Sequence, residues 1–162
     1  MRQVLRSKKF RVTFDTAFPQ VIYACGTSPR PGQDGTWLGR DMMQAYTGLH
    51  ELGYAHSVEV WQDDKLVGGL YGIAVGKVFC GESMFAKVSN ASKVGFITLV
   101  KVLERLEFAV VDCQIHTNHL ESLGAGEIER TEFESLLERY VPEPSLLGKW
   151  TQLAENHLDF EF

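Results

Sequence analysis

The stretch HSVEVWQDDKLVGGLYGIAVGKVFCGES (56–83) carries the pattern that decides the fold. Apolar and polar residues alternate at its start, and Asp63-Asp64 and Gly76 provide two turns, so it predicts three consecutive strands. Gly68-Gly69 falls inside the middle strand, where glycine weakens pairing and predicts a bulge or a close approach by another backbone. We therefore expect an antiparallel meander at the centre of the protein.

The last of these strands contains a carboxylate that needs an explanation. FCGESMF (79–85) places Glu82 within an apolar run. Burying an unpaired carboxylate costs on the order of several kcal/mol of folding free energy. Glu82 therefore requires a partner or a function, and the residue types alone do not say which.

The segments on either side of the meander predict helices and further strands. Helical spacing and capping residues predict five helices, at 15–24, 40–53, 90–108, 118–126 and 131–141. Asn90 is expected to cap the helix at 90–108, and Thr131 the helix at 131–141. Residues 9–14 and 109–115 read as strands, and 127–130 are compatible with another. Residues 27–35 form a long loop. The predicted fold class is α+β, with a mixed, mainly antiparallel sheet flanked by helices.

Length and composition favour one globular protein of ordinary type. The chain has 162 residues, of which 44% are hydrophobic and 23% charged, which suits a single domain with a sizeable core. We expect the domain over 1–141 and a C-terminal tail over 142–162. No apolar run is long enough to span a membrane, and the basic N-terminus lacks the apolar stretch of a signal peptide, so we expect a cytoplasmic protein.

Cysteines and histidines do not predict a metal centre. Cys25, Cys80 and Cys113 are far apart in the sequence, which argues against a disulfide framework and against a CxxC metal site. His116 and His119 are close together but lack a further ligand at a suitable spacing. We expect neither a metal nor a cofactor.

The charge of the chain is segregated although its net value is only −5. The first eleven residues contain five cations and no acid, namely Arg2, Arg6, Lys8, Lys9 and Arg11. Residues 127–162 carry nine acidic residues against three basic ones. The basic segment is either a local anion-binding patch or a solvated terminus.

Two places in the sequence could carry chemistry. Asp112 and Gln114 are two apart on a predicted strand, so their side chains should share one face. There the amide oxygen could accept a hydrogen bond from an amine while the carboxylate orients the amide; alternatively, Asp112 caps the next helix and Gln114 is solvated. Trp37 follows the long loop and could either stack on a base or close the core.

The order of elements resembles acyltransferases of the N-acetyltransferase (GNAT) type. Enzymes of that type that use coenzyme A bind its pyrophosphate on a glycine-rich loop before the helix that follows the meander. Here this place reads NASKVG (90–95), in which Gly95 already lies inside the helix. An acyl donor other than coenzyme A is therefore expected.

Several longer motifs are similar to one bacterial family. These are GTWLG (35–39), LHELGYAHSVEVW (49–61), LVGGLYGIAVGKVFCGESMF (66–85), NASK (90–93), VDCQ (111–114) and HLESLGA (119–125). They resemble leucyl/phenylalanyl-tRNA–protein transferases from about residue 10 to about 141. The resemblance implies transfer of Leu or Phe from an aminoacyl-tRNA to proteins that begin with Arg or Lys, in the N-degron pathway, on a GNAT-like fold without coenzyme A or metal.

The same resemblance implies roles for individual residues. Asp112 and Gln114 match the catalytic pair. Trp37, Glu82 and Ser83 match positions that contact the aminoacyl-adenosine. The pocket for the amino-acid side chain would be lined by Leu70, Phe79, Gly81, Met84, Phe96, Leu103 and Val111. Arg2, Arg6, Lys8, Lys9 and Arg11 match a stretch that binds tRNA.

One departure from the family leaves two alternatives open. Members have a smaller N-terminal domain with a GxFPW-like segment, and this sequence begins just upstream of the shared domain. The chain could then be an incomplete module that binds tRNA or N-terminal peptides without turnover. The other alternative is an acetyltransferase that uses acetyl-coenzyme A.

Overall fold

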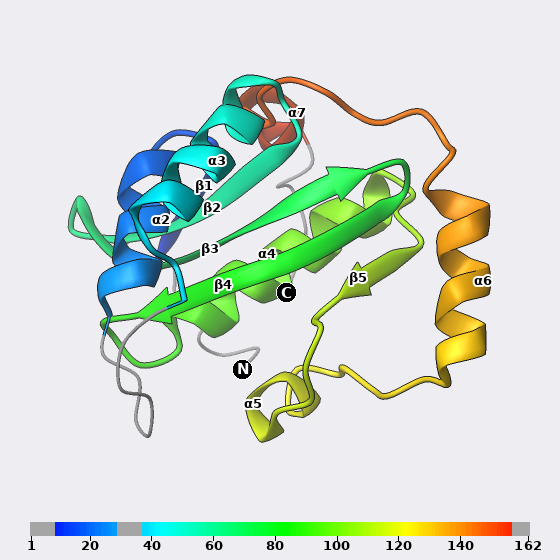
Figure 1. Ribbon diagram of the computed structural model, residues 1–162. Coiled ribbons are helices and arrows are strands. Elements are labelled where there is room, and N and C mark those ends of the chain that lie inside the picture. Colours follow the sequence, from blue (N-terminus) through cyan, green and yellow to red (C-terminus); the bar gives the residue numbers. More distant parts are fainter. Residues whose placement is uncertain (1–8, 29–36, 157–162) are drawn as a thin grey trace.

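The computed structural model describes residues 9–28 and 37–156, and these form a sheet covered by helices on both faces (Figure 1). The strand order is β1-β2-β3-β4-β5, with bounds Arg11–Phe14, Ala55–Gln62, Lys65–Val75, Val78–Ala86 and Val110–Asp112. The first four strands are antiparallel, and β5 pairs in parallel with β4. The predicted meander and the mixed, mainly antiparallel sheet are confirmed.

The five predicted helices are present with bounds that differ by up to five residues, and a further short helix that the sequence did not predict follows them. They are α2 (Phe18–Thr27), α3 (Arg40–Glu51), α4 (Ala91–Arg105), α5 (Asn118–Glu121), α6 (Arg130–Tyr140) and α7 (Thr151–Glu155). Helices α2 and α3 lie on one face of the sheet and α4 on the other, while α6 stands at its side (Figure 1). Among the described helices, none is long and apolar enough to cross a membrane.

Strand β4 contains a β-bulge at Glu82. Tyr71 of β3 pairs with Ser83 and Gly72 pairs with Gly81, so Glu82 is the extra residue between them. An extra residue changes which face the following side chains point to. In a regular strand Phe79 and Met84, five positions apart, would point to opposite faces of the sheet. The bulge brings them to the same face, and they join the same hydrophobic cluster. The bulge explains how a carboxylate is accommodated inside this apolar strand.

A second bulge lies in β3 where two glycines were predicted to mark one. Val60 pairs with Gly68 and Trp61 with Leu66, which leaves Val67 as the extra residue. A Cβ added at Gly68 would lie 2.6 Å from the Cβ of Ala91 in α4. Glycine is therefore required because the first turn of α4 approaches the strand this closely. Both parts of the prediction, bulge and close approach, are confirmed.

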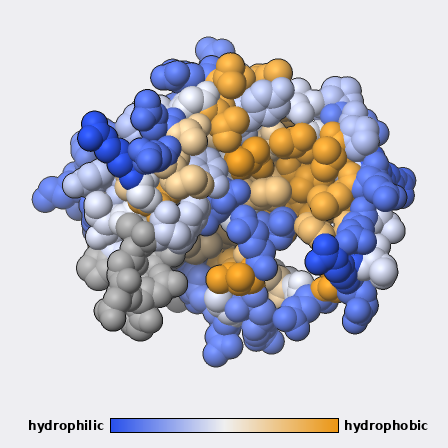
Figure 2. All heavy atoms as spheres, viewed as in Figure 1, coloured by the Kyte–Doolittle hydropathy of each residue, from blue (hydrophilic) through white to orange (hydrophobic). Residues whose placement is uncertain are grey.

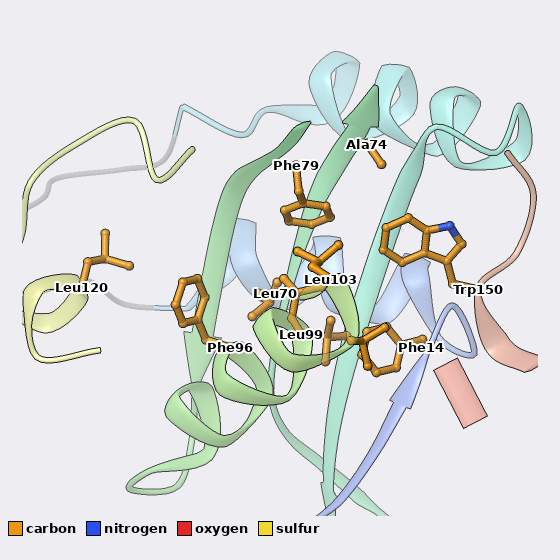
Figure 3. Packing of buried hydrophobic residues seen from close by; sticks show 11 residues of the cluster. Phe14, Leu70, Ala74, Phe79, Phe96, Leu99, Leu103, Leu120 and Trp150 are labelled. Carbon is orange, nitrogen blue, oxygen red and sulfur yellow. The ribbon is translucent and has the colours of Figure 1, made fainter. Parts of the chain in front are cut away.

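Two main clusters of hydrophobic residues hold the layers together. The cluster on the α4 side includes Leu70, Phe79, Leu99 and Leu103, each at most 3% exposed (Figure 3). The cluster on the other side joins α2 and α3 to the sheet. Burying one such side chain stabilises the fold by about 1.5–3 kcal/mol. The sheet is therefore packed on both faces, and the site must open at its ends or edges.

The segment after α6, which we expected to be a tail of uncertain order, packs against β1 and β2. Trp150 is 2% exposed and its ring stacks on His56 with centroids 3.8 Å apart. Its backbone N–H donates to Asp15 at 2.7 Å, and the same carboxylate accepts from Ser57 N at 2.8 Å and contacts His56 Nδ1 at 2.9 Å. Trp150 and Leu153 thus contribute to the core; the division at residue 141 remains a prediction.

A second buried carboxylate lies on β2. Glu59 is fully buried and accepts hydrogen bonds from the hydroxyl groups of Thr13, Thr16 and Ser57. Burial raises its pKa above the ordinary value, and the hydrogen bonds act in the opposite direction. Glu59 therefore ties β2 to the chain that leaves β1.

Three local predictions were wrong. Residues 127–129 form no strand, and α6 already begins at Arg130. Asn90 is the N-cap residue of α4 but adopts a left-handed φ of 69° and makes no side-chain cap. Thr131 does not cap α6, because its N-cap residue is Glu129 and Arg130 instead pairs with Glu134 at 2.7 Å. The predicted capping box is therefore absent from α6.

Candidate active site

The bulge turns Glu82 toward the helices that cover the sheet. The Tyr46 hydroxyl of α3 donates to Glu82 Oε2 at 2.8 Å. Tyr46 is itself 8% exposed, and its ring contacts Tyr71 edge-on with centroids 5.1 Å apart. Burial and the Glu82 carboxylate raise the pKa of the Tyr46 phenol. Tyr46 therefore remains a donor that fixes one oxygen of a partly exposed carboxylate.

Asp112 and Gln114 lie together next to β4, but not in the way the sequence predicts. Strand β5 ends at Asp112, and Gln114 has a φ of 64°, so strand alternation does not extend to it. Asp112 Oδ1 accepts the backbone N–H of Gln114 at 2.7 Å. The Gln114 side-chain NH₂ donates to the Gly81 carbonyl at 3.1 Å. The carboxylate therefore holds the backbone of Gln114, and the Gly81 carbonyl orients its amide.

The alternative role considered for Asp112, capping of the next helix, is wrong. The N-cap residue of α5 is Thr117, whose hydroxyl accepts from Leu120 N at 3.1 Å. Gln114 is exposed, as the alternative held, but its amide is bound to β4 through Gly81. The side-chain carbonyl oxygen of Gln114 is a hydrogen-bond acceptor.

Cys80 lies close to the carboxylates of both Asp112 and Glu82. Burial, then Asp112, then Glu82 raise the pKa of its thiol to about 11. Burial and Asp112 raise the pKa of Cys113 as well. Both thiols are therefore protonated at neutral pH and unsuited to act as nucleophiles. The end of β5 and the bulge of β4 together provide negative charge and hydrogen-bond acceptors.

Trp37 does not close the core. Its side chain is 49% exposed, and its ring meets Tyr46 edge-on with centroids 6.4 Å apart. It is thereby connected to Glu82 through a single intervening side chain. Ser83 follows Glu82 on β4, is partly buried and pairs with Tyr71.

The residues predicted to line the amino-acid pocket gather in one cluster. Leu70, Phe79, Phe96 and Leu103 are buried there, and Met84 and Val111 pack against them with partial exposure. Figure 3 shows Phe96 and Leu120 on the side of the cluster away from Trp150. Gly81 lies beside Asp112, whose carbonyl oxygen would be 3.6 Å from an added Cβ. The buried members form a floor, and Met84 and Val111 are the members that a ligand could reach.

Apolar surface also borders the site on the side of the sheet seen in Figure 2. Ile73 of β3 pairs with Cys80, and Ile73, Val75 and Val110 all remain partly exposed. Hydrophobic side chains gather on this part of the molecule, between the central strands and α6 (Figure 2). The polar groups of the site thus lie at the margin of an apolar area.

A sequence model of the leucyl/phenylalanyl-tRNA protein transferase family matches residues 1–138. The chain belongs to this family. Among its relatives, the leucyl/phenylalanyl-tRNA–protein transferase of Syntrophus aciditrophicus is 52% identical over 155 residues, which are 96% of this chain and 65% of the relative. That of Teredinibacter turnerae is 57% identical over 141 residues, 87% of this chain and 54% of the relative. The chain thus spans between half and two thirds of the length of these transferases.

Solved structures show the same fold at low sequence identity. An aminoglycoside acetyltransferase from an uncultured soil metagenomic sample, in complex with sisomicin, matches with a TM-score of 0.55, 9% identity, and coverage of 76% of this chain and 93% of the other. Aminoglycoside N-acetyltransferase AAC(6')-Iy in complex with CoA matches with a TM-score of 0.53, 12% identity, and coverage of 75% and 90%. These matches confirm the predicted GNAT-like fold.

In this member of the transferase family, the residues at the start of α4 do not fit the pyrophosphate of coenzyme A. The Ala91 N–H already donates to the Val88 carbonyl at 3.1 Å. Gly95 lies inside α4, where an added Cβ would come within 2.9 Å of Val60. This glycine therefore serves the packing of the helix on the sheet, and we derive no step through coenzyme A. Among the described residues, no group of three or more His, Cys, Asp or Glu is placed to hold a metal ion.

Of the predicted tRNA-binding residues, Lys9 and Arg11 lie in the described part of the chain. Arg11 forms an exposed ion pair with Asp64 at 3.3 Å, and its guanidinium lies 5.3 Å from the Trp61 ring centroid. The Lys9 ammonium lies 5.3 Å from the ring of Phe10. Arg2, Arg6 and Lys8 lie outside the described residues.

Sequence reasoning missed Tyr46 as part of the candidate site. Its spacing with Met43 and Leu49 on a helix indicates core packing, which is also true of its ring. Only the bulge, which directs Glu82 toward α3, makes its hydroxyl a partner of the site. The sequence carries no signal for this contact, because Tyr46 and Glu82 are 36 residues apart.

Proposed function

We propose that this chain transfers leucine or phenylalanine from an aminoacyl-tRNA to the N-terminal Arg or Lys of acceptor proteins. The observation that carries the proposal is membership of the transferase family together with the cluster formed by Glu82, Asp112 and Gln114. The product would expose Leu or Phe at its N-terminus, which is a signal of the N-degron pathway. Because charged tRNA and new proteins meet in the cytoplasm, the reaction is placed there.

The chemistry requires little more than positioning, because the aminoacyl ester is already activated. The neutral α-amine of the acceptor attacks the ester carbonyl carbon; a C–N bond forms and the C–O bond to the terminal ribose breaks. The proton that the amine loses balances the one that the leaving ribose oxygen takes up. In this proposal the Gln114 side-chain oxygen accepts from the attacking amine, and Asp112 acts as a positioning residue through the Gln114 backbone.

The donor would lie along β4 and α3. Trp37 offers an exposed aromatic face on which the terminal adenine stacks. Glu82, fixed by Tyr46, faces the ammonium of the donor amino acid or its nucleoside, with Ser83 beside it. The Leu or Phe side chain would pack on Met84 and Val111 above the buried members of their cluster. Discrimination by such a pocket amounts to about 1–3 kcal/mol per methylene, so some transfer of Met is expected.

Transfer from labelled Leu-tRNA to two peptides tests the proposal. The peptides differ only in their first residue, Arg in one and Ala in the other, and binding of each substrate is measured in parallel. Label on the Arg peptide alone supports the transferase. Binding of tRNA or peptide without any transfer would instead identify the chain as an incomplete binding module. Binding of tRNA should fall steeply with salt because phosphate contacts release counterions.

A further inference from the structure

A groove outside the candidate site combines aromatic rings with lysines. It lies between α2 and the strands β2 and β3, has a volume of about 870 Å³, and also reaches the residue that follows β4. We call it the α2 groove and define it by Tyr23, Thr27, Trp61, Lys65 and Lys87 among its lining residues. None of the predicted site residues lines it.

The lining of the α2 groove carries no carboxylate, although the chain has 21 acidic residues against 16 basic ones. Lys65 begins β3, Lys87 directly follows β4, and both are exposed, so two cations from separate parts of the chain line the groove. The nearby Asp64 is paired with Arg11 at 3.3 Å. On an acidic protein, such a local absence of negative charge favours an anionic partner.

The two aromatic rings are set in different ways. Tyr23 is 64% exposed on the outer side of α2. Trp61 is partly buried, and its indole N–H donates to the Thr13 hydroxyl at 2.8 Å. One wall is therefore a fixed ring and the other an accessible ring that makes no contribution to the core. Exposed aromatic side chains beside cations form the usual platform on which unpaired bases stack while phosphates meet the charges.

We propose that the α2 groove binds a single-stranded segment of RNA. An anionic phosphate chain with stacking bases matches its rings and lysines, whereas the basic N-terminus of an acceptor protein would be repelled by Lys65 and Lys87. Arg11, whose guanidinium lies 5.3 Å from the Trp61 ring, adds a further cation beside the groove.

The groove and the candidate active site are connected along β4. Lys87 follows Glu82 by five positions, which corresponds to about 17 Å along a strand. At its other wall, α2 ends at Thr27, and the chain returns at Trp37. One RNA could therefore contact both places. That this RNA is the acceptor end of the aminoacyl-tRNA rests on the proposed function, whereas the class of ligand does not.

The test uses fluorescence anisotropy with a labelled, uncharged single-stranded RNA of about twelve nucleotides, a length within the range bound by single-strand sites. Tyr23→Ala should weaken binding about five- to 150-fold, the effect of losing one stacked base. Lys65→Glu with Lys87→Glu should lower the slope of log affinity against log salt by about 1.4, since each single-strand phosphate contact contributes about 0.7.

Matched controls come from exposed residues elsewhere. Leu52→Ala removes a side chain that is 67% exposed directly after α3, and Lys149→Glu reverses an exposed charge after α6; both variants should bind RNA as the unaltered chain does. Thermal melting shows whether each variant is folded. Equal RNA affinity in folded Tyr23→Ala and in the double lysine variant would overturn the proposal. So would displacement of RNA by a polyglutamate peptide but not by unlabelled RNA, because the groove would then accept acidic protein.

The outcomes separate this inference from the proposed function. The RNA carries no amino acid, so its binding does not depend on transfer. Groove-dependent RNA binding without any aminoacyl transfer would leave this inference standing and reject the transferase proposal. If the unaltered chain transfers leucine but its groove variants bind RNA normally, the transferase proposal stands and this inference is rejected.

Discussion

The hydrogen bond between Tyr46 and Glu82 predicts a measurable coupling between α3 and the bulge of β4. Tyr46→Phe removes only the hydroxyl, and Glu82→Ala removes its acceptor, whose Oε2 lies 2.8 Å away. Hydrogen bonds to charged groups contribute about 1.5–3 kcal/mol. Because Glu82 is partly exposed and water can replace one partner, we expect the lower end, about 1.5 kcal/mol, as the coupling energy.

Urea denaturation of the unaltered chain, both single variants and the double variant provides that coupling energy. Tyr23→Phe on α2 is the matched control, because its ring is 64% exposed and should change the free energy of unfolding by less than about 0.5 kcal/mol. Additive effects of the two substitutions, within about 0.3–0.5 kcal/mol, would refute the account of how Glu82 is held.

Three further predictions concern the scaffold and are checked by chemical or thermal unfolding. Gly68→Ala should destabilise the chain by about 1–3 kcal/mol because its Cβ overlaps α4, whereas Gly48→Ala inside α3, with no atom within 4 Å of the added Cβ, should stabilise it by about 0.5–1 kcal/mol. Asp15→Asn should lower the free energy of unfolding by about 2–4 kcal/mol, since the amide has one acceptor oxygen in place of the two that now accept from Ser57, Trp150 and His56. The control Asp64→Asn, a change in an exposed ion pair, should alter it by no more than about 1 kcal/mol. Equal losses of stability in the two variants would contradict the account. Folding raises the pKa of Glu59, so the folded state binds the Glu59 proton more tightly than the unfolded state does. The stability of the unaltered chain relative to Glu59→Gln should therefore fall as the pH rises above the ordinary pKa of glutamate. A rise in this relative stability would mean that folding lowers the pKa instead.

The sequence predicted the elements with local signals and failed where tertiary contacts decide. Alternation and turn residues identified the meander, and Gly68-Gly69 correctly indicated a bulge and a close approach. The bulge at Glu82 was not predicted, and it is visible only in the pairing of β3 with β4. Capping by Thr131 failed because α6 already begins at Arg130, which places Thr131 inside the helix.

The candidate site follows the same division. Motif resemblance indicated Asp112, Gln114 and Glu82, and the structure places all three around Gly81 and Cys80. The assumption that Asp112 and Gln114 share a strand face was wrong, because β5 ends at Asp112. Positive φ at a glutamine is not encoded in any short pattern, so the backbone hydrogen bond between the two residues could not be foreseen.

The single-turnover rate of leucine transfer to an Arg-starting peptide, with Gln114→Ala compared to Gln44→Ala, tests the central claim most directly. Gln44 is exposed on α3 and makes a matched control. If the Gln114 amide accepts from the attacking amine, its loss should slow transfer by about 10²-fold or more, with folding and RNA binding retained. Near-full transfer by Gln114→Ala would contradict the claim that the end of β5 is where the peptide bond forms.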